Sequence, residues 1–251
     1  SLKDEKLSST EFLPELHLLI LGTESGNVYL MDFIEKKDII KQEKFKLNGR
    51  VERILKVPGS SKVYLIGKKG FHNIELQVTP AVLIPRPETE LLVDIALQEI
   101  KQIDDSVNSP KILDLGTGSG AIAVAIANEV PNSQIIATDQ SAEALAIAKL
   151  NAKSLKLESR VQFAQGSWYQ ALIENDIFDT ILSNPPYIRA QDPHLVEGDL
   201  RFEPADALTD HSTGLSCLEA IILGAKDHLK PMALLAVEHG YDQSDAVVKL
   251  M

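Results

Sequence analysis

The chain has 251 residues and a net charge of −11, with 44% hydrophobic and 24% charged residues, proportions typical of an ordinary globular protein. The acidic balance argues against a general nucleic-acid binder, because phosphate contacts need clustered lysine and arginine. The single cysteine, Cys217, excludes an internal disulfide framework and fits a reducing compartment; it is interpreted as a packing residue, with a nucleophile as the alternative. No apolar run approaches the roughly 18–20 residues of a membrane span, and the polar residues 1–10 are unlike a signal peptide. We expect a cytoplasmic protein.

The first 66 residues differ from the rest and predict a small β-rich segment. Apolar, β-branched runs predict four strands, at residues 16–21, 27–32, 50–57 and 62–66. Turns are expected at residues 22–26 and 58–61. The phrase "LGTESGNVYLMD" resembles strands of a β-propeller blade, but a propeller needs four or more blades. A β-rich appendage is therefore the favoured interpretation, and a propeller-like fragment is the alternative.

The predicted domain boundary lies between residues 66 and 67. Gly67–Gly70 is glycine-rich and predicts a turn. The run that follows, residues 71–78, alternates between apolar and polar side chains and predicts one strand of a hairpin. Residues 1–66 are thus assigned to the β-rich segment and residues 67–251 to a second domain.

A proline-rich segment precedes the first predicted helix. Pro85-Arg86-Pro87 fixes an extended backbone. Thr89 or Glu88 is placed to cap a helix predicted over residues 91–103. Arg86 is expected to be a structural ion-pair partner, with a ligand contact as the alternative.

From residue 110 onward, short apolar strands alternate with helices. Strands are predicted at residues 111–115, 134–138, 161–164, 178–182 and 234–238, and helices at residues 122–129, 142–155, 215–228 and 244–250. Such alternation indicates βαβ units, which build a parallel sheet with helices on both faces. The predicted fold class is therefore α/β, a doubly wound, mostly parallel, Rossmann-like sheet. Ligands of such sheets bind at the carboxyl ends of the strands.

A glycine loop, Gly116–Gly120, connects the first of these strands to the next helix. Glycines there allow a ligand to approach the backbone closely. Asp139 lies 19 residues beyond Gly120, at the end of the next predicted strand, where an acidic side chain suits a ribose diol. Asp114 adds a second negative charge, which would repel a pyrophosphate. The combination favours a nucleoside with a cationic group, S-adenosylmethionine, over NAD; the alternative is a merely tight strand–helix turn.

The only tryptophan, Trp168, follows the third predicted strand of this sheet. An indole at the carboxyl end of a strand is placed to stack on an adenine. The alternative interpretation is an aromatic residue at the rim of the core.

The run Asn184-Pro185-Pro186-Tyr187 ends the strand predicted at residues 178–182. Two prolines cannot continue a sheet ladder, so the loop that leaves the strand is stiff. The Asn184 side-chain oxygen and the Pro185 carbonyl can accept hydrogen bonds from an NH₂ group of a planar substrate, and Tyr187 can pack on it. Such contacts orient the nitrogen lone pair toward a methyl donor. A purely structural tight turn is the alternative.

These residues carry a family resemblance. From about residue 65 to residue 250 the chain resembles the HemK-type glutamine N5-methyltransferases, which modify the GGQ glutamine of peptide-chain release factors. The matching phrases are "VLIPRPETELLV", "ILDLGTGSGAIAVAIA", "ATDQSAEALAIAKLNA", "ILSNPPYI" and "GDLRFEPADAL". NPPY alone is shared with adenine and rRNA methyltransferases, whereas "IPRPETE" with a later "RFEP" is much more specific. The resemblance implies a class I methyltransferase fold, S-adenosylmethionine as cofactor and a release factor as protein partner.

The resemblance also implies roles for individual residues, and no metal site. The residues that would contact S-adenosylmethionine are Gly116, Thr117, Gly118, Ser119, Gly120, Asp139, Trp168 and Asn184. The substrate glutamine would be held by Asn184, Pro185, Pro186 and Tyr187, of which Asn184, Pro185 and Tyr187 would be catalytic. Arg86 and Glu203 would support the substrate pocket.

Three features depart from the family pattern. The family has a helical N-terminal domain, whereas residues 1–66 are predicted to be β. The usual Pro-Gly-Gly before the fifth strand is replaced by Pro231-Met232-Ala233. The sequence ends at Met251, where relatives continue into a closing β-hairpin, so the expected sheet is C-terminally truncated and has an open edge.

Two alternative functions stay open at this point. The first is a catalytically impaired module that binds the cofactor and serves in an interaction role; tight cofactor binding without turnover would favour it. The second is an adenine N6-methyltransferase, which the acidic charge and the asparagine that opens the PPY motif disfavour. Methyl incorporation into DNA but not into a release factor would favour that second alternative.

Overall fold

The computed structural model describes residues 6–13, 18–23, 27–34, 38–46, 51–56, 63–102, 109–196, 200 and 203–251. The chain divides into two compact units, one of residues 1–70 with 75–80 and one of residues 71–74 with 81–251. We propose a domain boundary between residues 66 and 67.

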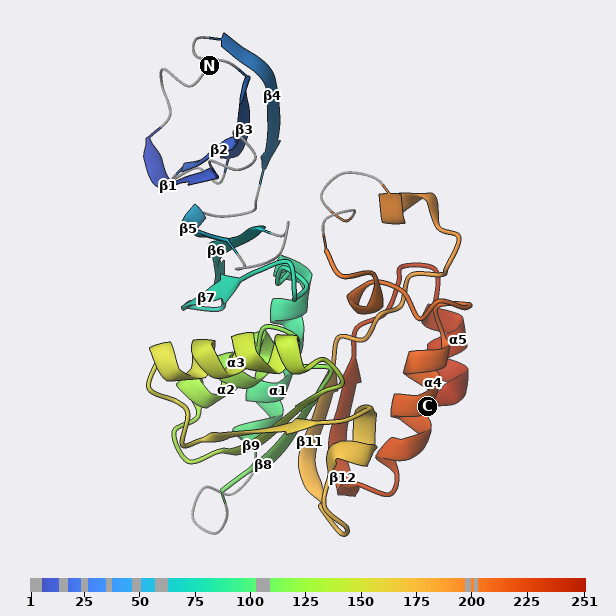
Figure 1. The fold of residues 1–251 in the computed structure, drawn as a ribbon. Helices are drawn as coiled ribbons and strands as arrows, with labels where there is room; N and C mark the ends of the chain where they lie inside the picture. Colours follow the sequence, from blue (N-terminus) through green and yellow to red (C-terminus); the bar gives the residue numbers. More distant parts are fainter. Residues whose placement is uncertain are drawn as a thin grey trace. The chain divides into compact units, whose positions relative to one another are not determined.

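The first unit contains a four-stranded antiparallel sheet in the order β1-β2-β3-β4 (Figure 1). Its strands are Leu7–Leu13, Leu18–Thr23, Asn27–Ile34 and Asp38–Lys46. The predicted β-rich character is confirmed, although β1 and β4 were not predicted, because both mix polar and apolar residues without a clear apolar run. Strand β2 includes residues 22 and 23 of the turn predicted at 22–26. Residues 24–26 of that turn, and the whole turn predicted at 58–61, lie outside the described residues.

A second small sheet has the order β5-β6-β7, with strands Val51–Lys56, Val63–Phe71 and Ile74–Val78. The prediction of a turn at Gly67–Gly70 is wrong, because these residues belong to β6. The single strand predicted over residues 71–78 is also wrong. The chain turns at His72 and Asn73, whose φ angles are 39° and 62°. A two-residue hairpin turn of this kind needs positive φ, which asparagine adopts more readily than most residues.

The second unit is built on a five-stranded sheet in the order β10-β9-β8-β11-β12, and every neighbouring pair is parallel. The strands are β8 Lys111–Leu115, β9 Gln134–Asp139, β10 Val161–Gln165, β11 Phe178–Ser183 and β12 Leu229–Val237. The chain order reverses between β8 and β11, and ligands of open α/β sheets bind at such a switch point. The predicted doubly wound parallel sheet is confirmed.

Five α-helices of the described residues accompany this sheet: α1 Glu90–Ile100, α2 Ala121–Glu129, α3 Ala142–Ser154, α4 Ser216–Ala225 and α5 Ser244–Leu250. Helix α2 contacts both α1 and α3, and α4 contacts α5 (Figure 1). Ser141 caps α3, since its Oγ accepts a hydrogen bond from the Ala144 N–H at 3.1 Å. The prediction that Thr89 or Glu88 caps α1 is wrong: Thr89 occupies the N-cap position, but no side-chain cap hydrogen bond forms.

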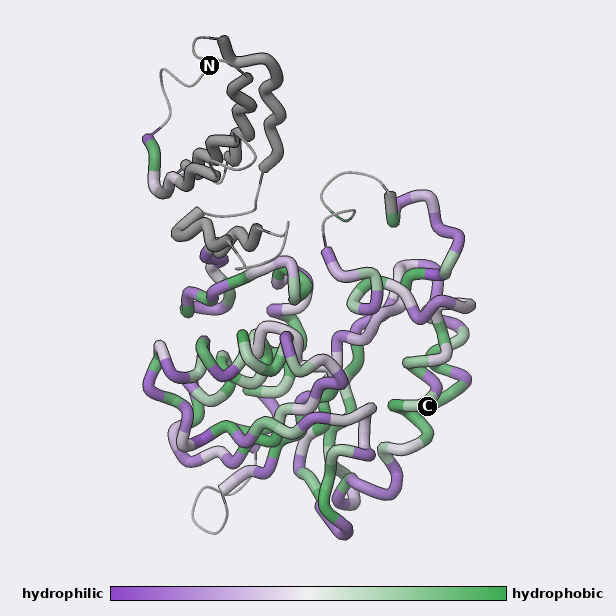
Figure 2. The backbone as a smooth tube through the Cα atoms, in the orientation of Figure 1, coloured by the Kyte–Doolittle hydropathy of each residue, from purple (hydrophilic) through white to green (hydrophobic). Residues whose placement is uncertain are grey.

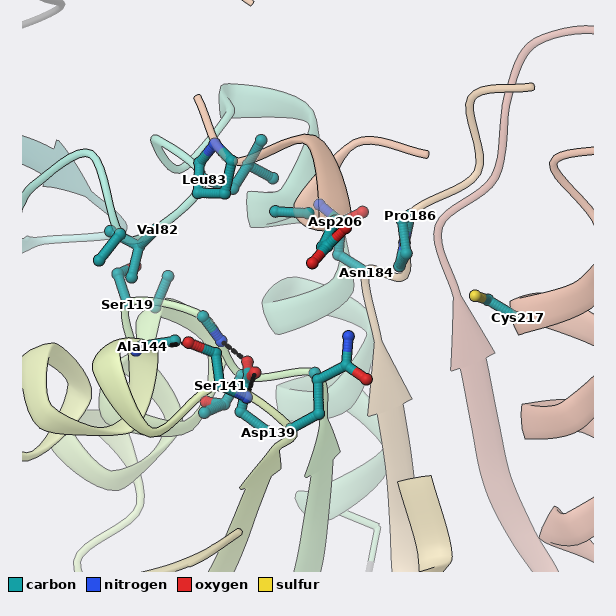
Figure 3. Close-up of a pocket in the computed structure, with 18 of the residues that line it drawn as sticks. Val82, Leu83, Ser119, Asp139, Ser141, Ala144, Asn184, Pro186, Asp206 and Cys217 are labelled. Atoms are coloured by element: carbon teal, nitrogen blue, oxygen red, sulfur yellow. Dashed lines mark hydrogen bonds between the residues drawn. The ribbon is translucent and has the colours of Figure 1, made fainter. Parts of the chain in front are cut away.

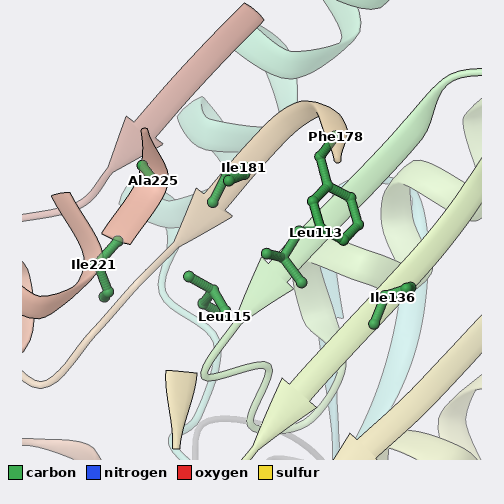
Figure 4. Packing of buried hydrophobic residues seen from close by; sticks show 7 residues of the cluster. All are labelled: Leu113, Leu115, Ile136, Phe178, Ile181, Ile221 and Ala225. Atoms are coloured by element: carbon green, nitrogen blue, oxygen red, sulfur yellow. The ribbon is translucent and has the colours of Figure 1, made fainter. Parts of the chain in front are cut away.

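The pleat of β8 places helices on opposite faces of the sheet. Asp114 points toward α2, where its carboxylate accepts from the Ala123 N–H. Leu113 and Leu115 point the other way, into a buried cluster with residues of β9, β11 and α4 (Figure 4). The tube of the second unit shows hydrophobic stretches (Figure 2), and the middle residues of β9 and β11 are buried, as expected for central strands of a parallel sheet. No helix of the described part of the chain is long and apolar enough to cross a membrane.

Candidate active site

A cavity of about 590 Å³ opens in the second unit, where the loops after β8, β9, β10 and β11 meet. Figure 3 shows Asn184 and Pro186 at the end of β11, and Asp139 at the end of β9. Seven predicted cofactor residues line the cavity, namely Gly116, Thr117, Gly118, Ser119, Asp139, Trp168 and Asn184. We refer to the glycine loop, Asp139 and Trp168 as the cofactor half, and to Asn184–Tyr187 with their hydrogen-bond partners as the amide half.

The glycine loop of the cofactor half is held by backbone and carboxylate hydrogen bonds. The Thr117 N–H donates to the Thr138 carbonyl at 2.9 Å, which ties the loop to β9. Asp139 accepts from the Gly118 N–H and from the Ser141 N–H, both at 2.9 Å. Because Asp139 is the last residue of β9, its carboxylate joins the glycine loop to the start of α3.

Trp168 lies against the glycine loop. A Cβ added to Gly116 would approach the Trp168 ring to 3.3 Å, and Gly116 has a φ of 71°. Both facts require glycine at this position. The half-buried indole also lines the cavity, so the structure brings together the glycine loop and the aromatic ring that the sequence placed in one site.

Gly120 is the one predicted cofactor residue that does not line the cavity. Its φ is 82°, and a Cβ there would lie 3.1 Å from the Ala148 Cβ and 3.2 Å from Val124. Ala148 belongs to α3 and Val124 to α2. Gly120 therefore allows these two helices to pack closely and starts α2.

Asp114 lies beneath the loop, with only 1% of its surface exposed. Its Oδ2 accepts from the Thr117 hydroxyl at 2.6 Å and from the Ala123 N–H at 3.2 Å. Among the described residues, its Oδ1 has no hydrogen-bond partner. Burial raises the pKa of Asp114 to about 6, against the lowering effect of the two hydrogen bonds, and Asp139 adds to the rise. Burial likewise raises the pKa of Asp139.

The residue types of the cofactor half fit S-adenosylmethionine. Asp139 on the cavity wall and the buried Asp114 beneath the loop are both acidic, and their negative charge disfavours an anionic pyrophosphate and favours a cationic group. Asp139 at the strand end is suited to a ribose diol, and its side chain borders the cavity. The Trp168 indole supplies a flat apolar surface for a base.

The amide half is a hydrogen-bonded chain of side chains. The Asn184 Nδ2 donates to the Thr89 Oγ1 at 2.9 Å, and the Thr89 hydroxyl donates to the Glu238 Oε2 at 2.7 Å. The Tyr187 hydroxyl donates to the other oxygen of Glu238 at 3.0 Å. Burial, and then the charge of Glu238, raise the pKa of Tyr187 above its usual range, so the phenol stays a neutral donor.

The two prolines of the amide half differ in exposure. Pro186 is half-buried and borders the cavity, whereas Pro185 is buried and does not. Tyr187 also lies outside the cavity lining. The structure thus brings Asn184 and Pro186 directly to the cavity, whereas Pro185 and Tyr187 are not among its lining residues.

Arg86 and Glu203 form an ion pair, and Glu203 also accepts from the Ile84 N–H at 3.1 Å. Neither residue lines the cavity, but their neighbours Pro85 and Pro204 do. The pair therefore ties together two loops of the cavity wall that are more than 100 residues apart. The two residues before Glu203, which belong to the predicted "RFEP" phrase, lie outside the described residues.

Several residues of the site were not predicted. Thr89 was interpreted as a helix cap, and Glu238 was not singled out, although it directly follows β12. The rule that ligands gather at carboxyl ends of parallel strands could have identified Glu238. Asp206, Asp210 and Cys217 also line the cavity, and Figure 3 shows Asp206 and Cys217. Burial raises the pKa of the Cys217 thiol, which agrees with a packing role.

The chain was compared with known proteins. Residues 89–201 match the family "Methyltransferase small domain". The release factor glutamine methyltransferase of Xylella fastidiosa strain Temecula1 is 50% identical over 193 residues, which cover 77% of this chain and 68% of that protein. The release factor glutamine methyltransferase of Salmonella typhimurium is 43% identical over 232 residues, covering 92% of this chain and 79% of that protein. The second alignment therefore reaches into the first 66 residues.

Among solved structures, the chain is similar to a methyltransferase from Pyrococcus furiosus, with a TM-score of 0.48, 18% identity, and coverage of 70% of this chain and 75% of that chain. The sequence relatives, with their high identity over most of both chains, decide the family. The chain belongs to the release factor glutamine methyltransferase family, whose methyl donor is S-adenosylmethionine.

Proposed function

We propose that this chain methylates the side-chain amide nitrogen of the GGQ glutamine in a peptide-chain release factor. The observation that carries the proposal is that one cavity is lined by both the cofactor half and Asn184. A carboxamide at the end of β11 is the group that suits a second carboxamide, because each can donate to and accept from the other.

The residues of the amide half have defined tasks in this proposal. When bound, S-adenosylmethionine supplies an electrophilic methyl group on a sulfonium. The Asn184 Oδ1 and the Pro185 carbonyl accept hydrogen bonds from the glutamine NH₂ and orient its lone pair toward the methyl carbon. The cofactor would supply the methyl group and keep the sulfur as a neutral thioether, and the methylated amide nitrogen would lose a proton to water. The rate acceleration comes mainly from positioning the substrate amide and from the dipoles of these two acceptors, which point at the charge that develops on its nitrogen.

Tyr187 and the two tied loops have supporting tasks. The phenol of Tyr187, fixed by Glu238, limits how the substrate amide can turn. Arg86 and Glu203 hold the cavity wall through their ion pair. The release factor is thus the proposed protein partner. A reducing cytoplasm is the proposed location, on the ground of the single cysteine.

The test is a methylation assay with the full chain, S-adenosylmethionine and a purified release factor, followed by mass spectrometry of the GGQ peptide. We expect one methyl group on the motif glutamine and none on a release factor in which that glutamine is replaced by alanine. Cofactor binding is measured in parallel by calorimetry. Tight binding without transfer would contradict the proposal and favour an interaction module, and transfer to DNA instead would favour an adenine methyltransferase.

A further inference from the structure

The amide of Asn184 can face the cavity with its oxygen or with its NH₂ group, and only one of these can accept a hydrogen bond from a substrate nitrogen. A carboxamide has no intrinsic preference between two orientations that differ by a half-turn. Something in the protein must therefore decide the orientation. The contacts of Asn184 show which side chains do so.

The order of donors and acceptors starts at Glu238. A carboxylate has acceptors only, so the Thr89 hydroxyl must donate its single proton toward the Glu238 Oε2, at 2.7 Å. The Thr89 oxygen is then left as an acceptor. The Asn184 side chain, 2.9 Å away, must present its Nδ2 donor there. The Asn184 Oδ1 is thereby turned away from Thr89 and kept as an acceptor.

The conformation of Thr89 supports a dedicated role for its hydroxyl. Thr89 ends the 3₁₀ turn Pro87–Thr89 that precedes α1, and its φ and ψ of −66° and −20° are helical rather than the extended values of a capping residue. Its hydroxyl makes no cap hydrogen bond, and the residue is 4% exposed. The hydroxyl instead links Asn184 to Glu238.

The position of Glu238 ties this link to the sheet. The Glu238 N–H donates to the Ser183 carbonyl at 2.9 Å, which extends the pairing of β12 with β11. Its carboxylate therefore has a fixed origin beside the loop that carries Asn184. The second oxygen accepts from the Tyr187 hydroxyl, so one carboxylate orients both the amide and the ring of the motif.

We propose that Glu238 and Thr89 are positioning residues that set the polarity of the Asn184 amide, so that its oxygen faces the substrate nitrogen. The inference rests on the proposed function for its catalytic consequence. Neither residue needs to touch the substrate. Their effect passes through Asn184 and, for Glu238, also through Tyr187.

The first test compares Thr89→Val with Thr89→Ser in the release factor methylation assay. Valine keeps the shape but removes the hydroxyl, and serine keeps the hydroxyl. We expect Thr89→Val to lower kcat roughly tenfold, the effect of one hydrogen bond of this kind, and Thr89→Ser to restore most of it. The unfolding temperature and the affinity for S-adenosylmethionine should stay near wild type in both. Full activity of Thr89→Val, or an equal loss in Thr89→Ser, would overturn the proposal.

A double-mutant cycle tests whether Thr89 acts through Asn184. In the background of Asn184→Ala, the Thr89→Val change should produce no further loss of turnover, because the group that it positions is already gone. Independent, additive losses would show that Thr89 acts in some other way.

A measurement without turnover separates this inference from the proposed function. In ¹⁵N-labelled protein, the Asn184 side-chain amide is assigned by its absence from Asn184→Ala. Its protons should exchange with water roughly tenfold faster in Thr89→Val, and also in Glu238→Ala, than in the wild type or Thr89→Ser. Equal exchange rates would overturn the inference even if release factor methylation is found. Slower exchange in the wild type and Thr89→Ser than in Thr89→Val and Glu238→Ala would uphold the inference even if the substrate proves to be another amide.

Discussion

The two halves of the cavity differ in how far apart in the sequence their partners lie. In the cofactor half, the loop Gly116–Gly120 is continuous, and Asp139 reaches Gly118 across 21 positions. In the amide half, Asn184 and Thr89 are 95 positions apart, and Thr89 and Glu238 are 149 apart. The cofactor half is thus mostly a local strand–loop–helix device, whereas the amide half is assembled by the sheet.

This difference indicates which kinds of mutation should impair each half of the cavity. The glycine loop depends on its backbone geometry, so cofactor binding should weaken when its glycines, or the carboxylates that hold the loop, are replaced. An assembled network depends on side-chain hydrogen bonds between distant elements, so it should respond to changes at any of its members. The two halves should therefore fail separately, and mutations can test this.

The largest effect is expected for Asn184→Ala, which removes the amide but leaves the glycine loop intact. Turnover should fall about 10²- to 10³-fold, as in the removal of a donor from an oxyanion hole. The affinity for S-adenosylmethionine, measured by calorimetry, should stay nearly unchanged. Equal loss of turnover and cofactor affinity would show that the two halves are one unit and that Asn184 mainly holds the cofactor or the fold.

The next effect concerns pH and Asp114, which supports the cofactor half. Its pKa rises from 3.8 to about 6 in the folded chain, so the neutral acid is favoured on folding. This contribution to stability is present below pH 3.8 and is lost as the pH rises through 6. Relative to Asp114→Asn, the free energy of unfolding of the cofactor-free wild type should therefore fall by about 2 kcal/mol between about pH 4 and 7.

Urea unfolding of both proteins over this pH range provides the measurement. Taking the difference between wild type and Asp114→Asn removes the contribution of all the other carboxylates. A difference that does not change with pH would mean that Asp114 titrates as an exposed aspartate. The base of the glycine loop would then be open to water.

Asp139→Ala is expected to weaken cofactor binding before it affects turnover. The change removes the acceptor of the Gly118 and Ser141 N–H groups. The loss of such charge-assisted hydrogen bonds should lower the affinity for S-adenosylmethionine roughly 10- to 100-fold. At saturating cofactor, kcat should recover much of its wild-type value. A fall in kcat that persists at saturation would show that the cofactor half also positions the amide half.

The smallest effect is expected at Met232, which lies in neither half of the cavity. This residue is fully exposed and has a φ of 63°, a conformation that disfavours side chains with a Cβ. Met232→Gly should raise the free energy of unfolding by roughly 1 kcal/mol, measured by urea denaturation. Cofactor affinity and turnover should not change, which makes this variant a control for the three above. A loss of stability would show that the methionine side chain has a packing role.

The glycine loop and the NPPY run could be identified from the sequence because each is short and continuous. The strands that carry them are apolar runs of five or six residues, and the parallel sheet follows from their alternation with helices. Thr89 was singled out in the sequence, but its role was predicted wrongly. A threonine before a helix predicts a cap, and only its neighbours in space show that its hydroxyl has another partner. The turn at His72 and Asn73 was missed because glycines nearby carried the stronger local signal.

The sequence by itself therefore determined the fold class, the glycine loop with Asp139, and the carboxamide motif at a strand end. These depend on interactions between residues close in the chain or on simple periodicity. Only the tertiary structure decided that Gly120 serves helix packing, that Arg86 and Glu203 tie two loops, and that Glu238 orients Asn184 through Thr89. Those assignments depend on contacts between helices, strands and loops about 30 to 150 positions apart. Such contacts exist only after the parallel sheet has formed and brought the carboxyl ends of its strands together.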